Sequence, residues 1–227
     1  AGSDAAELIH QLRVGIRRLR TALRELDGVA PARLDAAAWE PVLVKSFRTL
    51  GAQRDRDVLS AKMAPRLQAV GAPVAELPKA DSKQEVSSQG ELVRRADFQK
   101  LLVALIGFTA PPEDAAPVSK DEADSVRDAV SRHLNKLHRQ LRKAGKRFEE
   151  LPVDEQHRAR KRLKRLRYLA EFVAPLYDKD KPKRYVEQLL PAQDALGDYN
   201  DEVVAIDAYG EAAAQDPGAW FAEGWLT

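Results

Sequence analysis

"IHQLRVGIRRLRTAL" at residues 9–23 aligns without a gap with "QHRARKRLKRLRYLA" at residues 156–170. A second pair of segments, "LGAQRDRDVL" at 50–59 and "LGDYNDEVVA" at 196–205, aligns in almost the same register. One such match can arise by chance, but two in one register predict an internal repeat. The equivalent positions include His10 and His157, Arg13 and Arg160, Arg20 and Arg167, Gly51 and Gly197, and Asp55 and Asp201.

The apolar residues of the first segment are three or four positions apart, which is the spacing of an amphipathic helix. This stripe consists of Leu8, Leu12, Ile16, Leu19, Leu23 and Leu26. No segment alternates apolar and polar residues as a half-buried strand does. We therefore expect an all-α protein made of two related helical bundles, with further helices over 40–70, 91–108, 120–149, 155–177 and 182–213.

Two polar segments interrupt the helical pattern. "ELPKADSKQEVSSQGE" at 76–91 is typical of a loop. "TAPPEDAAPVSKDE" at 109–122 contains three prolines and places Ser119 before acidic residues, where a helix is expected to start. The predicted boundary lies in this second segment, with an N-terminal bundle over 1–115 and a C-terminal bundle over 116–227 that together make one unit. Further helix ends or starts are expected at Pro152, Pro175, Pro182 and Pro217.

Several classes of function are excluded or disfavoured. The chain has no cysteine, so disulfides, thiolate nucleophiles and thiolate metal sites are excluded. It has no Gly-rich phosphate loop, serine elbow or H-E-x-x-H motif, so we expect no catalytic residue, no metal and no cofactor. Its apolar stretch at 101–112 is too short to span a bilayer and the N-terminus lacks a signal-peptide pattern, so a soluble cytoplasmic chain is expected.

Charge is strongly segregated along the chain, although the net charge is only +2. Segments 8–24, 129–148 and 156–170 contain 19 of the 37 Lys and Arg residues and no acid. The chain after Arg184 contains nine acids and no Lys or Arg. The near-neutral total is therefore an average over basic and acidic regions, and the basic regions are candidates for an anionic partner.

The basic residues form rows along the predicted helices. At about 100° per residue, each row occupies one narrow arc beside the apolar stripe. Cations three or four residues apart repel one another unless acids lie between them, which favours a bound anion over simple solubility. The rows are His10, Arg13, Arg17, Arg20 and Arg24; Arg132, Lys136, Arg139, Lys143 and Lys146; and His157, Arg160, Lys164 and Arg167 with Lys161 beside them.

Several partners fit such rows. Acids on a neighbouring helix, or the acidic C-terminal segment, could neutralise them within the chain. A nucleic acid would suit the cations, but Tyr168 is the only aromatic residue within 8–24 and 156–170, so platforms for stacking bases are missing. A polyanion without bases fits better, because it gains from counterion release along its length. Inorganic polyphosphate is the simplest such partner, with other polyanions as further candidates; neither a monomer nor a dimer is favoured.

The two basic segments and the two "LG" elements together resemble the CHAD domain family, the histidine-containing α-helical domains. The resemblance covers most of the chain and implies two four-helix bundles related by a pseudo-two-fold axis, with a basic groove between them. It also implies binding of inorganic polyphosphate, often on polyphosphate granules. The residues that match the family motifs are His10, Arg13, Arg17, Arg18, Arg20, His157, Arg160, Lys161, Lys164, Arg165 and Arg167, and Arg54 lies in the first "LG" element.

Individual histidines and acids keep alternative roles. His10 and His157 could contact phosphate, make structural hydrogen bonds, or serve in catalysis or metal binding, of which phosphate contact is favoured, whereas His133 and His138 are expected to be incidental or peripheral. Asp55 and Asp201 are expected to brace helices rather than to hold a divalent cation. The predicted function is non-catalytic polyphosphate binding. The alternatives are a nucleic-acid-binding module, a phosphohydrolase acting on polyphosphate, and a structural bundle that neutralises its own basic faces.

Overall fold

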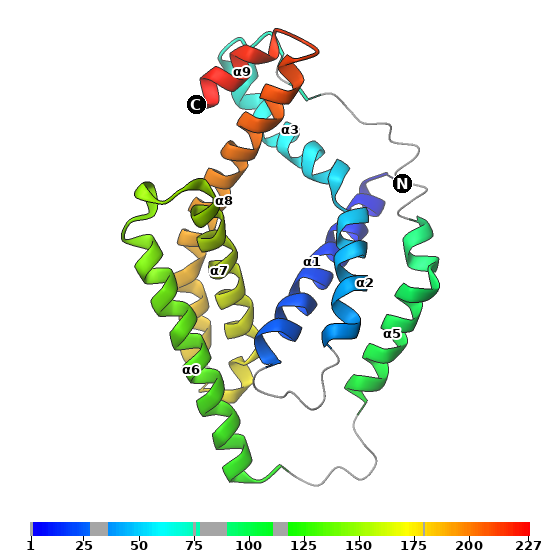
Figure 1. Cartoon of the computed structure of the whole chain (residues 1–227), viewed down its shortest axis with the longest axis vertical. Coiled ribbons are helices and arrows are strands. Elements are labelled where there is room, and N and C mark those ends of the chain that lie inside the picture. Colours follow the sequence, from blue (N-terminus) through cyan, green and yellow to red (C-terminus); the bar gives the residue numbers. More distant parts are fainter. Residues whose placement is uncertain (1, 28–35, 75, 78–89, 111–117, 179) are drawn as a thin grey trace. The chain divides into compact units, whose positions relative to one another are not determined.

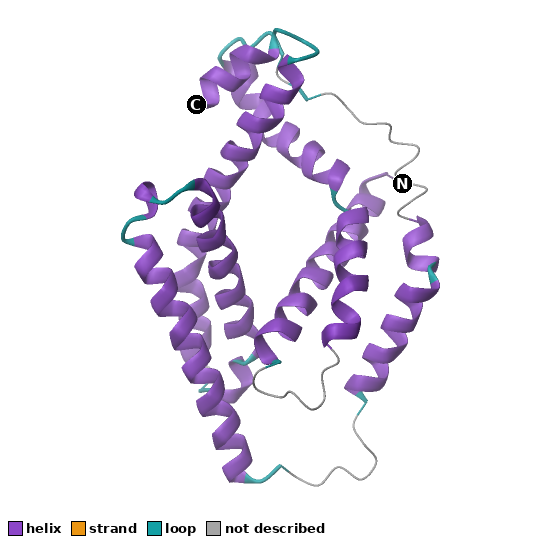
Figure 2. Cartoon of the chain, viewed as in Figure 1, coloured by secondary structure: helices purple, strands orange, loops and turns teal. Residues whose placement is uncertain are grey.

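The computed structural model describes residues 2–27, 36–74, 76–77, 90–110, 118–178 and 180–227, and the side chains of all of these except 2–6, 36 and 52–58. In these ranges the regular structure is helical and no strand is present (Figures 1 and 2), which confirms the all-α prediction. The helices are α1 (Gly2–Leu26), α2 (Ala36–Thr49), α3 (Ala52–Ala69), α5 (Ala96–Thr109), α6 (Lys120–Gly145), α7 (Val153–Phe172), α8 (Asp180–Ala213) and α9 (Ala219–Leu226), with 3-10 turns η1 (Phe148–Glu150) and η2 (Ala174–Leu176).

The chain divides into two compact units, each built from two separate stretches of the sequence. One unit comprises Ala1–Leu43 and Lys100–Leu196, and the other comprises Val44–Gln99 and Gly197–Thr227. The repeat-based halves, 1–115 and 116–227, remain a prediction about how the sequence is organised. Both compact units draw residues from both predicted halves.

In the first unit, α7 packs against both α1 and α6. The core is a cluster of leucines and valines from α6, α7 and the first part of α8, with Leu163, Leu166 and Leu169 of α7 at or below 1% exposure. Leu26 at the end of α1 packs on the same cluster. This packing holds the two segments that carry the basic motifs, on α1 and α7, against one another.

The apolar stripe of α1 is buried at Ile16 and Leu23, as its spacing predicts. Leu8 is an exception, because its side chain is 71% exposed. Arg13 and Glu25 are buried instead, so the buried surface of α1 includes charged positions. Periodicity therefore identified the helix and most of its core face, and assigned Leu8 to that face wrongly.

The second unit has a separate core between α3, the C-terminal part of α8 and α9. Met63, Leu67 and Tyr209 are completely buried there, together with small alanines from α8 and α9. Those alanines allow the helices to approach closely. α9 also exposes Trp220, Phe221 and Trp225, and the Arg66 guanidinium lies 5.5 Å from the centre of the Trp225 ring.

Local signals explain several helix boundaries. Ser119 caps α6 in a complete capping box: its hydroxyl accepts from the Glu122 N–H, and the Glu122 carboxylate accepts from the Ser119 N–H. Pro152 is the N-cap of α7, so both predicted starts are confirmed. By contrast, α8 runs through Gly197, whereas the equivalent Gly51 separates α2 from α3. The two aligned segments therefore differ here: the first is interrupted at Gly51, and the second lies within one continuous helix.

None of the helices in the described ranges combines the length and apolar character needed to cross a membrane. The predicted loop at 76–91 lies mostly outside the described residues, as does much of the proline-rich segment at 109–122.

Candidate anion-binding faces

The basic row of α6 faces solvent. Its positions lie on the opposite side of the helix from Val130 and Leu137, which pack in the core formed with α7. In the part of the chain that the structure describes, no side chain of this row makes a hydrogen bond or ion pair. The row thus carries five uncompensated charges, all exposed: Arg132, Lys136, Arg139, Lys143 and Lys146.

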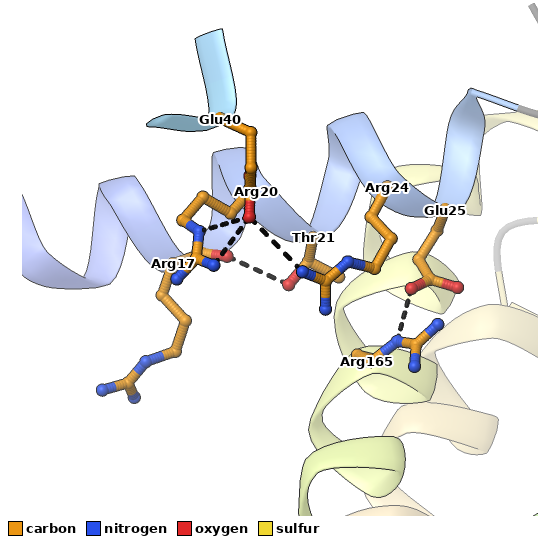
Figure 3. A network of polar contacts seen from close by, with 7 residues as sticks. All are labelled: Arg17, Arg20, Thr21, Arg24, Glu25, Glu40 and Arg165. Carbon is orange, nitrogen blue, oxygen red and sulfur yellow. Dashed lines mark hydrogen bonds and ion pairs between the residues drawn. The ribbon is translucent and has the colours of Figure 1, made fainter. Parts of the chain in front are cut away.

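The arginines at the end of α1 are arranged differently, because Glu40 of α2 neutralises two of them (Figure 3). A single carboxylate oxygen, Glu40 Oε1, accepts from Arg20 Nε at 3.1 Å and from Arg20 Nη2 at 2.7 Å. The same oxygen accepts from Arg24 Nη2 at 3.4 Å. Arg17 extends away from Glu40 in the same view. Two cations of the predicted row therefore share one carboxylate from the neighbouring helix.

Glu171 of α7 joins two further motif arginines, one from each of the two aligned basic segments. One carboxylate oxygen accepts from Arg18 of α1, and the other accepts from Arg167 of α7. The guanidiniums of Arg18 and Arg167 lie 5.4 and 4.6 Å from the centre of the Tyr168 ring, within cation–π range. Arg167 also donates from Nε to the Gln193 side chain at 2.6 Å. This cluster fixes α1 against α7 and uses both oxygens of its carboxylate.

Glu25 is the most deeply buried of the three acids, with a side chain only 1% exposed. Its two oxygens bond to Arg165 of α7 and to His133 Nε2 of α6, the latter at 2.8 Å. Burial alone would raise the pKa of Glu25, but the hydrogen bonds from Arg165 and His133 outweigh it and hold the pKa below its ordinary value. The prediction that His133 is peripheral is therefore wrong, because it helps to connect α1, α6 and α7.

The remaining motif residues lie on α1 and α7. Arg13 is 5% exposed and Lys161 is exposed, whereas the side chains of the others are half-buried: His10, Arg17, His157, Arg160 and Lys164. Arg13, Arg17 and Arg160 each take part in further polar or ring interactions, as do His157 and Lys164. The side chain of Arg54 lies outside the described residues.

The acidic C-terminal segment pairs with α3 in the second unit. Lys62 Nζ donates to Asp198 and to Asp201, both at 2.7 Å, and Arg66 donates to Glu202 at 2.9 Å. Desolvation lowers the pKa of Lys62, but its two acidic partners outweigh this effect and raise it. The expected bracing role of Asp201 is confirmed, and the side chain of Asp55 lies outside the described residues.

Sequence reasoning identified the cations but not the acids that neutralise them. Glu25 lies one residue beyond the acid-free segment 8–24, and Glu171 directly follows the second basic segment, 156–170. Glu40 lies on a different helix, α2. The only available signal was the general possibility that acids on a neighbouring helix neutralise a basic face. That possibility holds for Arg18, Arg20, Arg24 and Arg165, whereas Arg167 pairs with Glu171 of its own helix, and among described residues the α6 row has no such partner.

Two curated relatives match, the Uncharacterized protein MT2285 of Mycobacterium tuberculosis strain CDC 1551 and the Uncharacterized protein Rv2226 of strain H37Rv. Each is 29% identical over 215 residues, which covers 89% of this chain and 40% of the relative. The chain thus spans about two fifths of the length of these relatives.

A solved structure agrees over nearly the whole chain. The crystal structure of the CHAD domain from the plant Ricinus communis is 30% identical, with a TM-score of 0.71 over 97% of this chain and 75% of that one. The family model of the CHAD domain matches residues 1–209. The chain therefore belongs to the CHAD domain family, which is linked in general to polyphosphate binding.

Proposed function

We propose that this chain binds long inorganic polyphosphate without transforming it. The observation that carries the proposal is the row of five exposed α6 cations that have no acidic partner among the described residues. Attraction to the helix dipole accounts for cations in the last turn only, and Arg132, Lys136 and Arg139 lie earlier in α6. Their mutual repulsion is relieved when an external anion lies along the helix.

The geometry of the row favours a long ligand over a small one. Arg132 and Lys146 are 14 residues apart in sequence, which corresponds to about 20 Å along a helix at 1.5 Å per residue. Orthophosphate can meet only one or two of these cations at a time, whereas a linear polyanion can meet all of them. Each further phosphate that pairs with a cation releases more condensed counterions. Both the affinity and its dependence on salt should therefore increase with ligand length.

The chemistry of the row also favours phosphate over bases. The segment between Arg132 and Lys146 contains no Phe, Tyr or Trp, and no histidine belongs to the row itself, so the row offers charge but no large stacking surface for a nucleobase. It contains no acid that could hold a catalytic metal beside a phosphate, which supports binding rather than hydrolysis. Recruitment to polyphosphate granules is the cellular role that we propose for such a surface.

The test is a titration with size-graded polyphosphate at two salt concentrations. The first variant replaces four α6 cations: R132Q, K136Q, R139Q and K143Q. Glutamine keeps the helix propensity of these positions close to that of Lys and Arg. The matched control removes two Arg and two Lys that are exposed elsewhere: R94Q, R184Q, K100Q and K183Q.

We expect the α6 variant to lose at least tenfold in affinity for long polyphosphate, with a salt slope shallower by about 3. The control should lose much less, although its net charge is identical. Equal losses would show that binding follows net charge and not the α6 row. Displacement of polyphosphate by RNA or DNA at equal phosphate concentration would favour a nucleic-acid-binding module, and release of orthophosphate with Mg²⁺ or Mn²⁺ would favour an enzyme.

A further inference from the structure

The three acids that neutralise motif arginines differ in how firmly they are held. Glu25 is buried and bonded through both oxygens, and Glu171 uses both oxygens and is 22% exposed. Glu40 is 33% exposed, and all of its bonds to Arg20 and Arg24 converge on Oε1. One of those bonds, to the half-exposed Arg24, is long at 3.4 Å. Glu40 is therefore the acid that an external anion could most easily replace.

The geometry at Arg20 is suboptimal for a carboxylate. An arginine makes its strongest contact when two N–H groups meet two different oxygens of a planar anion. Here Arg20 Nε and Nη2 both point at the same oxygen (Figure 3). A phosphate group presents several oxygens, so it can accept from Arg20 through two of them and still accept from Arg24. Exchange of the carboxylate for phosphate would thus gain contacts rather than lose them.

We propose that Glu40 is an internal competitor that occupies Arg20 and Arg24 until a phosphate group displaces it. This inference rests on the proposed binding of polyphosphate and adds a residue that tunes it. In the free chain, Glu40 reduces the charge of two arginines to that of one. Weakly charged anions therefore gain little by displacing Glu40. A long polyphosphate that is already bound to other cations of the protein, by contrast, brings its phosphate groups to Arg20 and Arg24 at high local concentration.

The decisive variant is E40Q, which keeps the shape of the side chain and removes its charge. Affinity for long polyphosphate should increase by about three- to fivefold, the range expected from loss of a competing surface ion pair. The salt slope should steepen by somewhat less than one unit, because one more cation becomes available to the ligand. The matched control is D27N, which removes an exposed acid close in sequence to Arg24 but outside its ion pair.

A third variant locates the effect. In E40Q/R24Q the gain should largely disappear, because one of the two liberated arginines is removed together with its competitor. Circular dichroism and thermal unfolding establish that each variant is folded before it is titrated.

The outcomes separate this inference from the proposed function. If wild type binds polyphosphate and E40Q binds it equally or more weakly, Glu40 positions the arginines or has no role, and the inference is overturned. An equal gain in D27N would assign the effect to net charge and would also overturn it. If neither wild type nor E40Q binds polyphosphate, the proposed function and the inference both fail.

Discussion

The buried carboxylate of Glu25 accepts a hydrogen bond from Arg165 across a separation of 140 residues in sequence. The bond joins α1 to α7, the two helices that carry the repeated basic motif. His133 of α6 contacts the other oxygen, so one acid connects three helices of the first unit. An arginine that matches a family motif thus has a structural role, and its charge is largely committed before any ligand arrives.

Substitution of Glu25 by glutamine should destabilise the fold. E25Q places a neutral amide at a buried position and leaves the half-buried Arg165 and His133 without their anionic partner, so we expect a loss of about 2 to 3 kcal/mol in the free energy of unfolding. Urea denaturation followed by circular dichroism measures this change. E150Q is the matched control, because Glu150 pairs with Arg147 on the surface and should contribute little. A loss in E25Q no larger than that in E150Q would contradict the structural role of Glu25.

The stability that Glu25 provides should depend on pH. Its pKa is lower in the folded chain than its ordinary value of 4.5, so the unfolded chain takes up the proton first as pH falls. The contribution is therefore complete above that ordinary value and is lost as pH falls through the lowered folded pKa. The difference in unfolding free energy between wild type and E25Q should be constant near neutrality and should shrink below about pH 5. If the difference in unfolding free energy grew as the pH fell, the pKa of Glu25 would not be lowered in the folded chain.

Removal of the cap of α6 should weaken that helix. S119A deletes the hydroxyl that accepts from the Glu122 N–H, so we expect a loss of about 1 kcal/mol in the free energy of unfolding. S125A serves as the control, since Ser125 is exposed inside the same helix and alanine has the higher helix propensity. Thermal unfolding should therefore show a lower midpoint for S119A and an equal or higher one for S125A.

The α6 variant R132Q/K136Q/R139Q/K143Q should be no less stable than wild type. In wild type, repulsion between two cations three or four residues apart in α6 costs about 0.2 to 0.5 kcal/mol. The variant removes several such pairs, so the relief of repulsion should stabilise it. Loss of the favourable interaction between Lys143 and the C-terminus of the helix offsets part of this gain. Thermal unfolding at low and high salt measures the balance, and the gain should diminish at high salt because the charges are screened. A marked loss of stability would mean that these cations have structural partners.

The sequence predicted helices well because their signals are local. The spacing of Ile16 and Leu23, the cap at Ser119 and the position of Pro152 each depend on neighbours within a few residues. Pro191 is an exception to these local signals. A proline within a helical pattern predicts a break in the helix, but Pro191 lies inside α8. Packing against the rest of the fold can override a local preference of this kind.

The partners of the basic residues could not be predicted in the same way. Arg18 meets Glu171 across 153 residues, and Arg20 meets Glu40 across a segment between two helices. Such pairs depend on how helices pack, which composition and periodicity do not specify. The motif therefore revealed where positive charge accumulates, but not which of those charges are already neutralised.

The spacing of the α6 row has a consequence for how a bound chain would behave. Its cations recur every three or four residues and each carries one positive charge, so a uniform polymer shifted by one step meets a similar row of charges. No single register is then preferred, and the bound state comprises many nearly equivalent alignments. A longer chain has more such alignments, so it gains a statistical advantage without any additional contact and can slide along the helix while it remains bound.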